Sequence, residues 1–126
     1  HLKLGQSHPD YNSVPATSGW HLDSPARWGV HNNFIPDETL VHNLEHGGIG
    51  IHYNCPELCP GLTEQLESIV VRADEVILSP YPEMPTRIAL TAWTYLDTFE
   101  EFDEDRIEAF IAAHMNSSVA PEYAAR

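Results

Sequence analysis

The spacing of apolar residues along this chain changes several times between the period of a helix and that of a strand. This alternation limits the fold more than any other feature of the sequence. Residues 62–73 place Leu, Ile, Val and Ala side chains on one helical face, directly after a Pro60-Gly61 break. Residues 75–79 and 87–93 instead have the composition and alternation of strands. Short segments of both kinds favour an α+β domain.

Residues 37–46 are predicted to form a short helix that Asp37 caps and Gly47 ends. An extended conformation stays open for this segment, because it is short and Val41 is β-branched. Residues 49–53 alternate apolar and polar side chains, which predicts a strand.

The last predicted helix covers residues 104–114. Asp103 is a suitable N-cap for it, and Phe102 can pack on Ile107 as a hydrophobic staple. The order of segments is therefore loop, helix, strand, helix, strand, strand, helix. It predicts an α+β fold with a small, mostly antiparallel sheet, two to three helices and a long ordered N-terminal loop region.

The length of 126 residues predicts a single domain, residues 1–126. Residues 1–35 are rich in Pro, Gly, Ser, Asn and His, so we expect a loop-rich segment that packs on an α+β core of residues 36–115. Residues 116–126 are expected to form a loose tail. The aromatic side chains that the N-terminal segment is expected to bury are Tyr11, Trp20, Trp28 and Phe34.

The chain has 19 Asp and Glu residues against 6 Lys and Arg, and its formal net charge is −13. This balance argues against nucleic acid or an anionic membrane as a partner, since both attract positive charge. No apolar run is long enough to cross a bilayer, and no signal peptide is visible. A removed leader or N-terminal membrane anchor stays open, because the sequence starts abruptly at His1.

Residues 42–59 hold three histidines and both cysteines, the side chains that bind transition metals best. His42 and His46 are four positions apart, so a helix brings them to one face at about 6 Å. Both rings can then bind one ion, and Glu45 between them can orient a ring or act as a base. The alternative is a pair of half-buried structural histidines with ordinary hydrogen bonds.

Two further residues are candidate ligands of the same ion. His21 follows Gly19 in the turn-forming segment TSGWH, which can hold its ring in place as a third ligand. Met84 lies between prolines in YPEMP and is a candidate axial ligand, because a thioether favours copper over zinc or magnesium. His52 is a weaker candidate, since a ring on a predicted strand can simply pack.

The segment HNLEH also matches H-x-x-E-H, the inverted zinc-protease motif, in which two histidines hold zinc and the glutamate activates water. A zinc-dependent hydrolase is therefore an alternative. Against it, Gly47-Gly48 ends the predicted helix at once, and the third ligand has to be a distant carboxylate such as Glu122.

Cys55 and Cys59 lie in CPELCP, and three interpretations compete for them: a short disulfide in an oxidising compartment, a metal-binding pair and a redox pair. The CxxxC spacing weakens the ordinary redox interpretation. The segment follows a predicted strand and opens a helix, and in this it resembles the copper site of the Sco-type chaperones. The likeness covers this short segment alone and does not extend to their fold.

Segments spread over nearly the whole chain carry one more likeness; they are His1, TSGWH (17–21), WGV (28–30), LVHNLEHGGIGIHY (40–53), ILSPYPEMPTRIALTAW (77–93) and FDEDRIEAFIAAH (102–114). Together they resemble an uncharacterised bacterial domain-of-unknown-function family marked by TSG-x-H and VHNLEHGG. Here Trp20 stands where that family usually has proline. The resemblance implies a domain that is exported or membrane-anchored, and it marks as important the positions His21, His42, Glu45, His46, Gly47 and Gly48.

We therefore expect an extracytoplasmic transition-metal-binding domain for copper storage, delivery or sensing, without turnover. The expected ligands are His21, His42, His46 and Met84, and the expected partners are the metal ion and a protein that delivers or accepts it. Zinc is the alternative ion. The alternative functions are a zinc-dependent hydrolase using HNLEH and a non-catalytic interaction domain with structural histidines.

Overall fold

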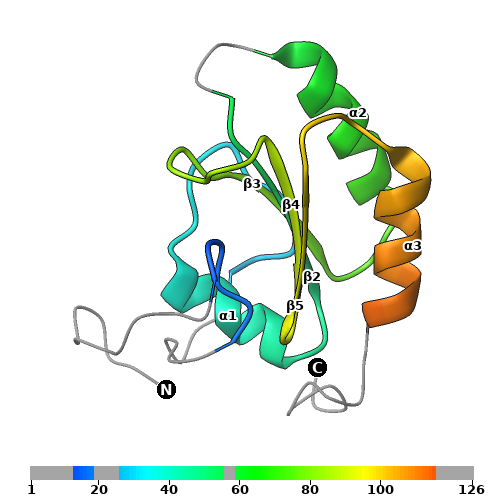
Figure 1. The fold of residues 1–126 in the computed structure, drawn as a ribbon. Coiled ribbons are helices and arrows are strands. Elements are labelled where there is room, and N and C mark those ends of the chain that lie inside the picture. Colours follow the sequence, from blue (N-terminus) through cyan, green and yellow to red (C-terminus); the bar gives the residue numbers. More distant parts are fainter. Residues whose placement is uncertain (1–12, 19–25, 56–58, 116–126) are drawn as a thin grey trace.

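The computed structural model of this protein describes residues 13–18, 26–55 and 59–115. Within them the chain forms three helices and five strands, which confirms the predicted α+β class (Figure 1). In chain order the elements are β1 (Gly29–Val30), α1 (Asp37–Glu45), β2 (Ile49–Tyr53), α2 (Pro60–Val70), β3 (Val76–Pro80), β4 (Ile88–Ala92), β5 (Tyr95–Phe99) and α3 (Glu104–His114).

The five strands form one sheet in the order β1-β3-β2-β4-β5. Strand β3 runs parallel to both β1 and β2, whereas β4 runs antiparallel to β2 and to β5. The antiparallel ladders hold most of the paired positions, as the sequence predicts. A parallel pair needs a crossover connection, and α2 lies in the one that joins β2 to β3.

Helices cover both faces of the sheet, with α2 and α3 on one face and α1 on the other (Figure 1). The larger apolar core lies on the α2–α3 side, because alternate strand residues point there. The apolar faces predicted for both helices pack into this core. Its buried members are Ile49, Ile51, Leu66, Ile69, Val70, Val76, Leu78, Ile88, Leu90, Ala92, Phe99, Ile107 and Phe110.

The α1 side of the sheet is smaller and more polar. Leu40 of α1 packs there against Ile77 of β3. The buried residues of β2 and β4 on this face include His52 and Thr91, and His52 Nε2 lies 2.8 Å from Thr91 Oγ1. A Cβ atom at Gly50 would lie 2.7 Å from that same Nε2, so the histidine occupies the space of a side chain at Gly50.

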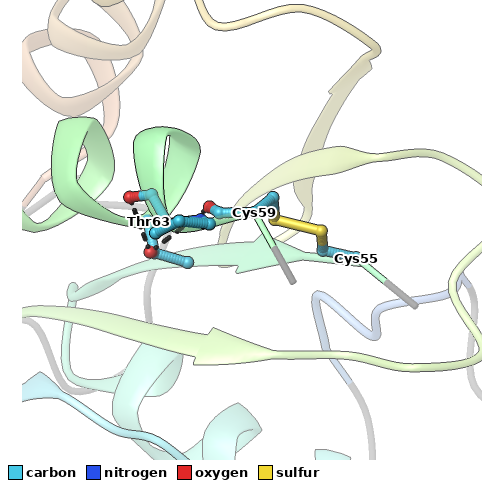
Figure 2. Close-up of a disulfide and its surroundings, with 4 residues drawn as sticks. Cys55, Cys59 and Thr63 are labelled. Atoms are coloured by element: carbon cyan, nitrogen blue, oxygen red, sulfur yellow. Dashed lines mark hydrogen bonds between the residues drawn. A yellow bond between two sulfur atoms is a disulfide. The ribbon is translucent and has the colours of Figure 1, made fainter. Parts of the chain in front are cut away.

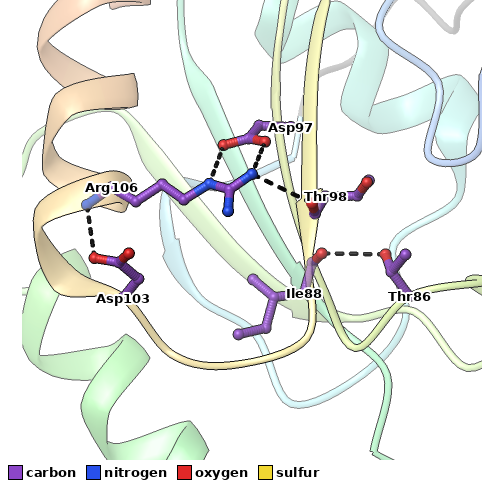
Figure 3. Close-up of polar contacts among 6 residues, drawn as sticks. All are labelled: Thr86, Ile88, Asp97, Thr98, Asp103 and Arg106. Carbon is purple, nitrogen blue, oxygen red and sulfur yellow. Dashed lines mark hydrogen bonds and ion pairs between the residues drawn. The ribbon is translucent and has the colours of Figure 1, made fainter.

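Helix α3 is tied to the edge strand β5, as Figure 3 shows. Asp103 caps the helix as predicted, because its carboxylate accepts a hydrogen bond of 3.1 Å from the backbone N–H of Arg106. The Arg106 guanidinium donates two bonds to Asp97, of 2.8 and 2.6 Å, and lies 4.4 Å from the centre of the Phe99 ring. These bonds hold the pKa of Asp97 below its ordinary value.

Two expectations about individual residues are wrong. The N-cap of α1 is Pro36, and Asp37 is the first helical residue; its Oδ2 accepts a hydrogen bond of 2.9 Å from the Tyr81 hydroxyl. Phe34 is 45% exposed and not buried. Its ring meets the Tyr81 ring edge to face at 5.0 Å, so it covers one side of Tyr81 and leaves its own outer side open.

The bounds of several elements and the number of strands also differ from the expectation. The helix predicted at residues 62–73 begins at Pro60 and ends at Val70, because proline is well suited to the first helical position. Strand β5 was not predicted at all, and β1 lies in the segment expected to be loop.

Tyr11, Trp20 and the predicted tail at residues 116–126 lie outside the described residues. Trp28 is partly buried against the Leu40–Ile77 cluster, as expected. Among the helices that the structure describes, none has the length and apolar character needed to span a bilayer.

Candidate metal centre

His42 and His46 extend from one face of α1 and meet at their Nε2 atoms, which lie 2.9 Å apart. The rings are stacked, with an angle of 13° between their planes and 4.8 Å between their centres. The helix persists through Glu45, and Gly47 with a φ of 93° ends it as predicted. The helical alternative for residues 37–46 is therefore the correct one, and it brings the two rings together.

Two ring nitrogens at 2.9 Å cannot both turn a lone pair toward each other. Each neutral imidazole has one nitrogen that carries a lone pair, and two lone pairs that face each other at this distance repel. A proton on one Nε2 turns the contact into a hydrogen bond, and a bound cation satisfies both lone pairs at once. The pair as it stands is a hydrogen bond, and a metal ion that binds both rings would take the place of the shared hydrogen.

The distance between the two Nε2 atoms also sets the angle at a metal ion that both of them bind. With a metal at about 2.0–2.1 Å from each nitrogen, a 2.9 Å separation corresponds to an angle of about 90° at the metal. A tetrahedral ion would need about 3.3 Å between the same atoms. A shift of a few tenths of an ångström in either ring converts one geometry into the other, so the separation fits copper and zinc alike.

Helix α1 is buried on nearly all sides, which limits the access of water to the pair. Six consecutive residues from Leu40 to Glu45 are buried, and His42 and Glu45 are only 7% and 8% exposed. His46 is half-buried. A helix that is buried on both its apolar and its polar sides must be covered by something besides the sheet.

Part of that cover is a segment that we call the strap, residues 26–31. The Asn43 side chain holds its first residue, because Asn43 Oδ1 accepts a 2.7 Å bond from Ala26 N–H and Asn43 Nδ2 donates a 2.9 Å bond to Ala26 O. Further along the strap, β1 pairs with β3, and His31 N–H donates a 2.8 Å bond to Leu78 O. The strap is therefore docked on both α1 and the sheet.

The Trp28 ring of the strap lies against Gly48. A Cβ atom at Gly48 would overlap this ring and would lie 3.1 Å from the Asn43 carbonyl oxygen. That oxygen also accepts a 3.1 Å bond from Gly48 N–H. The second glycine of the HGG turn is thus needed for close approach of the strap to the end of α1.

His21, the predicted third ligand, lies outside the described residues. Among the residues that the structure does describe, no group of three or more His, Cys, Asp or Glu side chains could hold a metal ion. The role of His21 therefore stays a prediction. The strap begins five positions after it, and Thr17, four positions before it, accepts a 2.9 Å backbone bond from Thr94 N–H.

Met84 and His52 are both buried on the α1 side of the sheet. Met84 packs with Tyr81 and Ala89, so its role as an axial ligand stays a prediction. The His52 ring is fully buried beside Thr91 and Tyr81, and burial lowers its pKa from 6.5 to about 3. His52 is thus an uncharged core residue, which agrees with the expectation that a ring on this strand can simply pack.

Cys55 and Cys59 form a disulfide beside the N-terminus of α2 (Figure 2). The Cys59 carbonyl oxygen accepts bonds from the backbone N–H of Thr63, at 3.2 Å, and from the Thr63 hydroxyl, at 3.4 Å. The disulfide therefore joins the end of β2 to the first turn of α2. Of the three interpretations offered by the sequence, the structure contains the short disulfide.

Sequence reasoning did not identify Asn43 as a residue of interest. It is 1% exposed, although asparagine is usually an exposed residue of turns and caps. An asparagine in the middle of a helical segment, between two buried positions, is the signal that could have identified it.

A search of curated proteins and a search of solved structures each found no match. The family model described as protein of unknown function DUF3105 matches residues 3–126. Since that match spans almost the full sequence, the chain belongs to the DUF3105 family.

Proposed function

We propose that this chain is a transition-metal-binding domain that acts outside the cytoplasm, with His42, His46 and His21 as ligands. The observation that carries the proposal is the 2.9 Å separation of the His42 and His46 Nε2 atoms, which fits a shared cation. The strap supports it, because Ala26, which is five positions after His21 in the sequence, is docked on Asn43 of the same helix.

Copper is the preferred ion over zinc. Imidazoles together with a methionine thioether at Met84 would let the same site hold Cu(I), which prefers soft ligands. A net charge of −13 raises the local concentration of any cation.

The location outside the cytoplasm is supported by the Cys55–Cys59 disulfide, because such crosslinks persist in oxidising compartments. The family resemblance points the same way. The proposed role is storage, delivery or sensing of copper, with a second protein that supplies or receives the ion.

Calorimetric titration with Cu(I), Cu(II) and Zn(II) tests the proposal. Wild type should bind one ion with a preference for copper, and the variant His42→Ala/His46→Ala should lose that binding. His31→Ala is the matched control, because the His31 ring bonds to Arg27 O in the strap and is not part of the pair. Equal binding by wild type and the double variant would leave the pair as a structural hydrogen bond.

The variant Glu45→Gln separates this proposal from a zinc hydrolase built on HNLEH. Glu45 is buried, and it lies one helical turn from His42. The proposal predicts that the variant keeps its metal affinity. Zinc-dependent hydrolysis in wild type that disappears in the variant, with zinc retained, would favour the hydrolase.

A further inference from the structure

A surface pocket of about 340 Å³ lies where the turn after β3 meets the start of α1. Among the residues that the structure describes, its lining consists of Phe34, Tyr81, Pro82 and Glu83. Tyr81 is the buried part of this lining, whereas the other three residues are exposed. The volume is at the lower end of the range for small-ligand sites, so the pocket suits a single side chain or a small molecule. We call it the Phe34 pocket.

The Phe34 pocket is built on a turn that hydrogen bonds hold in place. Tyr81 N–H donates to Tyr53 O at 2.8 Å, and Met84 N–H donates to Tyr81 O at 3.2 Å. Asn54 Nδ2 donates to Met84 O at 2.7 Å. The Tyr81 hydroxyl donates to Asp37 Oδ2 at 2.9 Å and so ties the turn to the start of α1. The pocket is therefore formed before a ligand binds, which lowers the conformational entropy that binding costs.

The polar groups identified in the lining accept hydrogen bonds. The Tyr81 hydroxyl gives its one hydrogen to Asp37, so its oxygen can only accept from a ligand. The Tyr81 N–H is bonded to Tyr53 O, and Pro82 has no N–H. Glu83 adds an exposed carboxylate, which is an acceptor when ionised. A ligand rich in hydrogen-bond donors therefore matches this lining better than a phosphate or a carboxylate does.

The charge around the Phe34 pocket is negative. Asp37 and Glu38 lie in the first turn of α1, where the helix dipole contributes about half a positive charge. Together with Glu83, they set three carboxylates against that half charge. Burial raises the pKa of Tyr81 above its ordinary value, and the charges of these three carboxylates raise it further. The field at Tyr81 thus favours a cation.

The two aromatic rings of the lining favour one kind of cation. The Phe34 and Tyr81 rings are nearly perpendicular, at 87°, and Phe34 is 45% exposed. The face of an aromatic ring attracts cations, arginine more often than lysine. A guanidinium is planar, so it can stack on such a face and still direct its edge N–H groups to a carboxylate such as Glu83. The ammonium group of lysine is a compact point charge without this second use.

From these features we infer that the Phe34 pocket is a docking site for an arginine side chain of a partner protein. The guanidinium stacks on Phe34 and pairs with Glu83. A net charge of −13 adds long-range attraction for a basic partner. Pro36 and Pro82 are exposed beside the pocket, so the residues that flank the arginine in a polypeptide find apolar surface there, which a free amino acid would leave uncovered.

The Phe34 pocket and the histidine pair use opposite ends of α1. Asp37 and His46 are nine positions apart, which corresponds to about 14 Å along the helix axis. The inference therefore goes beyond the proposed metal site and does not depend on it.

Titration of isotope-labelled protein with capped arginine (N-acetyl-arginine methylamide), followed through amide chemical shifts, tests the inference. We expect saturable shifts at Phe34, Tyr81 and Glu83. Capped citrulline has the same shape without the charge, and capped lysine has the charge without the planar group, so both should bind more weakly. A peptide with arginine between two alanines should bind at least as tightly as capped arginine.

Two variants remove the two proposed contacts one at a time. Phe34→Leu keeps an apolar side chain without the ring, and Glu83→Gln keeps the shape without the charge. Each should weaken the binding of capped arginine about two- to fivefold, the usual effect of losing an exposed cation–π contact or ion pair. Thermal melts establish that each variant folds.

Each variant has a matched control. Glu64→Gln removes the same charge from an exposed position of α2, on the other face of the sheet (Figure 1). Tyr95→Leu removes a ring that is 41% exposed on β5. Both controls should bind capped arginine as wild type does.

Shifts that are absent from the Phe34 pocket, or an equal affinity for capped citrulline or capped lysine, would overturn the inference. Equal weakening by Glu64→Gln would do the same, because it would show general attraction to an acidic protein. Free arginine that binds more tightly than the capped form would assign the pocket to an amino acid and not to a partner protein. The histidine pair is intact in all these variants, so copper titration reports on the proposed function separately.

Discussion

The Nε2 atoms of His42 and His46 face each other across 2.9 Å at the end of a buried helix, so either the hydrogen of an N–H···N bond or a bound cation must lie between the two rings. The hydrogen bond and a bound metal ion need the two rings in different protonation states. A metal needs the Nε2 atoms of both rings free of hydrogen, whereas the hydrogen bond needs a hydrogen on one of them.

The first prediction concerns the pH dependence of copper affinity. A ring whose metal-binding nitrogen carries a proton cannot bind a metal, so binding must displace that proton. Copper affinity should therefore fall as the pH is lowered. Isothermal titration from pH 5 to 8 measures this. An affinity that stays flat down to pH 5 would point to ligands other than histidine.

A second prediction separates Met84 as a ligand from Met84 as a packing residue. Its side chain is 3% exposed and packs with Tyr81 and Ala89, so Met84→Leu should cost less than about 1.5 kcal/mol of stability. The variant should bind Cu(I) more weakly and Zn(II) as wild type does, because only the soft ion uses the thioether. Unchanged Cu(I) affinity would assign Met84 to the core alone.

The third prediction follows from the buried ring of His52, whose pKa is lowered to about 3. The ring is uncharged in the folded chain and takes up a proton on unfolding below its ordinary pKa of 6.5, so its contribution to stability is complete above that pH and is lost as the pH falls toward 3. Between pH 7 and pH 5 the loss is on the order of 2 kcal/mol.

Urea unfolding at the two pH values measures this difference. His52→Gln should lack this part of the pH dependence, and His31→Gln, with a ring at the surface of the strap, should keep it. The same pH dependence in wild type and in His52→Gln would show that other groups cause the loss of stability.

Gly48 and Gly61 give a matched pair for the fourth prediction. A methyl group at Gly48 meets the Trp28 ring and the Asn43 carbonyl oxygen, so Gly48→Ala should destabilise the fold by about 1–3 kcal/mol or displace the strap. Nothing lies within 4 Å of a Cβ atom at Gly61 in the first turn of α2, so Gly61→Ala should be neutral or slightly stabilising. Thermal melts compare the two, and equal melting temperatures would argue against the close approach of Trp28.

Much of the fold could be predicted from the sequence, because helix caps and the spacing of apolar residues are features of single short segments. The helix at residues 104–114 has both its cap at Asp103 and its apolar stripe, and its bounds are those predicted. Strand β5 was missed because its hairpin turn has no ordinary turn signal. The turn residues are Trp93 and Thr94, and Thr94 adopts a positive φ of 67°, a conformation usually supplied by Gly or Asn.

In the candidate site, too, the contacts that are local in sequence were predictable and those between distant positions were not. The contact of His42 with His46 follows from helical spacing alone, and it was predicted. The clamp of Asn43 on Ala26 joins positions 17 residues apart, and no periodicity relates them. Pro36 as the cap of α1 was missed because Asp37 is the stronger cap by residue type, but its carboxylate bonds to the distant Tyr81 hydroxyl.

The measurement that tests the central claim most directly is an anomalous-difference map at the copper absorption edge, from crystals of untagged protein grown with Cu(II). The account predicts one strong peak at bonding distance from the Nε2 atoms of both His42 and His46. A map without a peak between those rings, from crystals in which both side chains are well ordered, would contradict it.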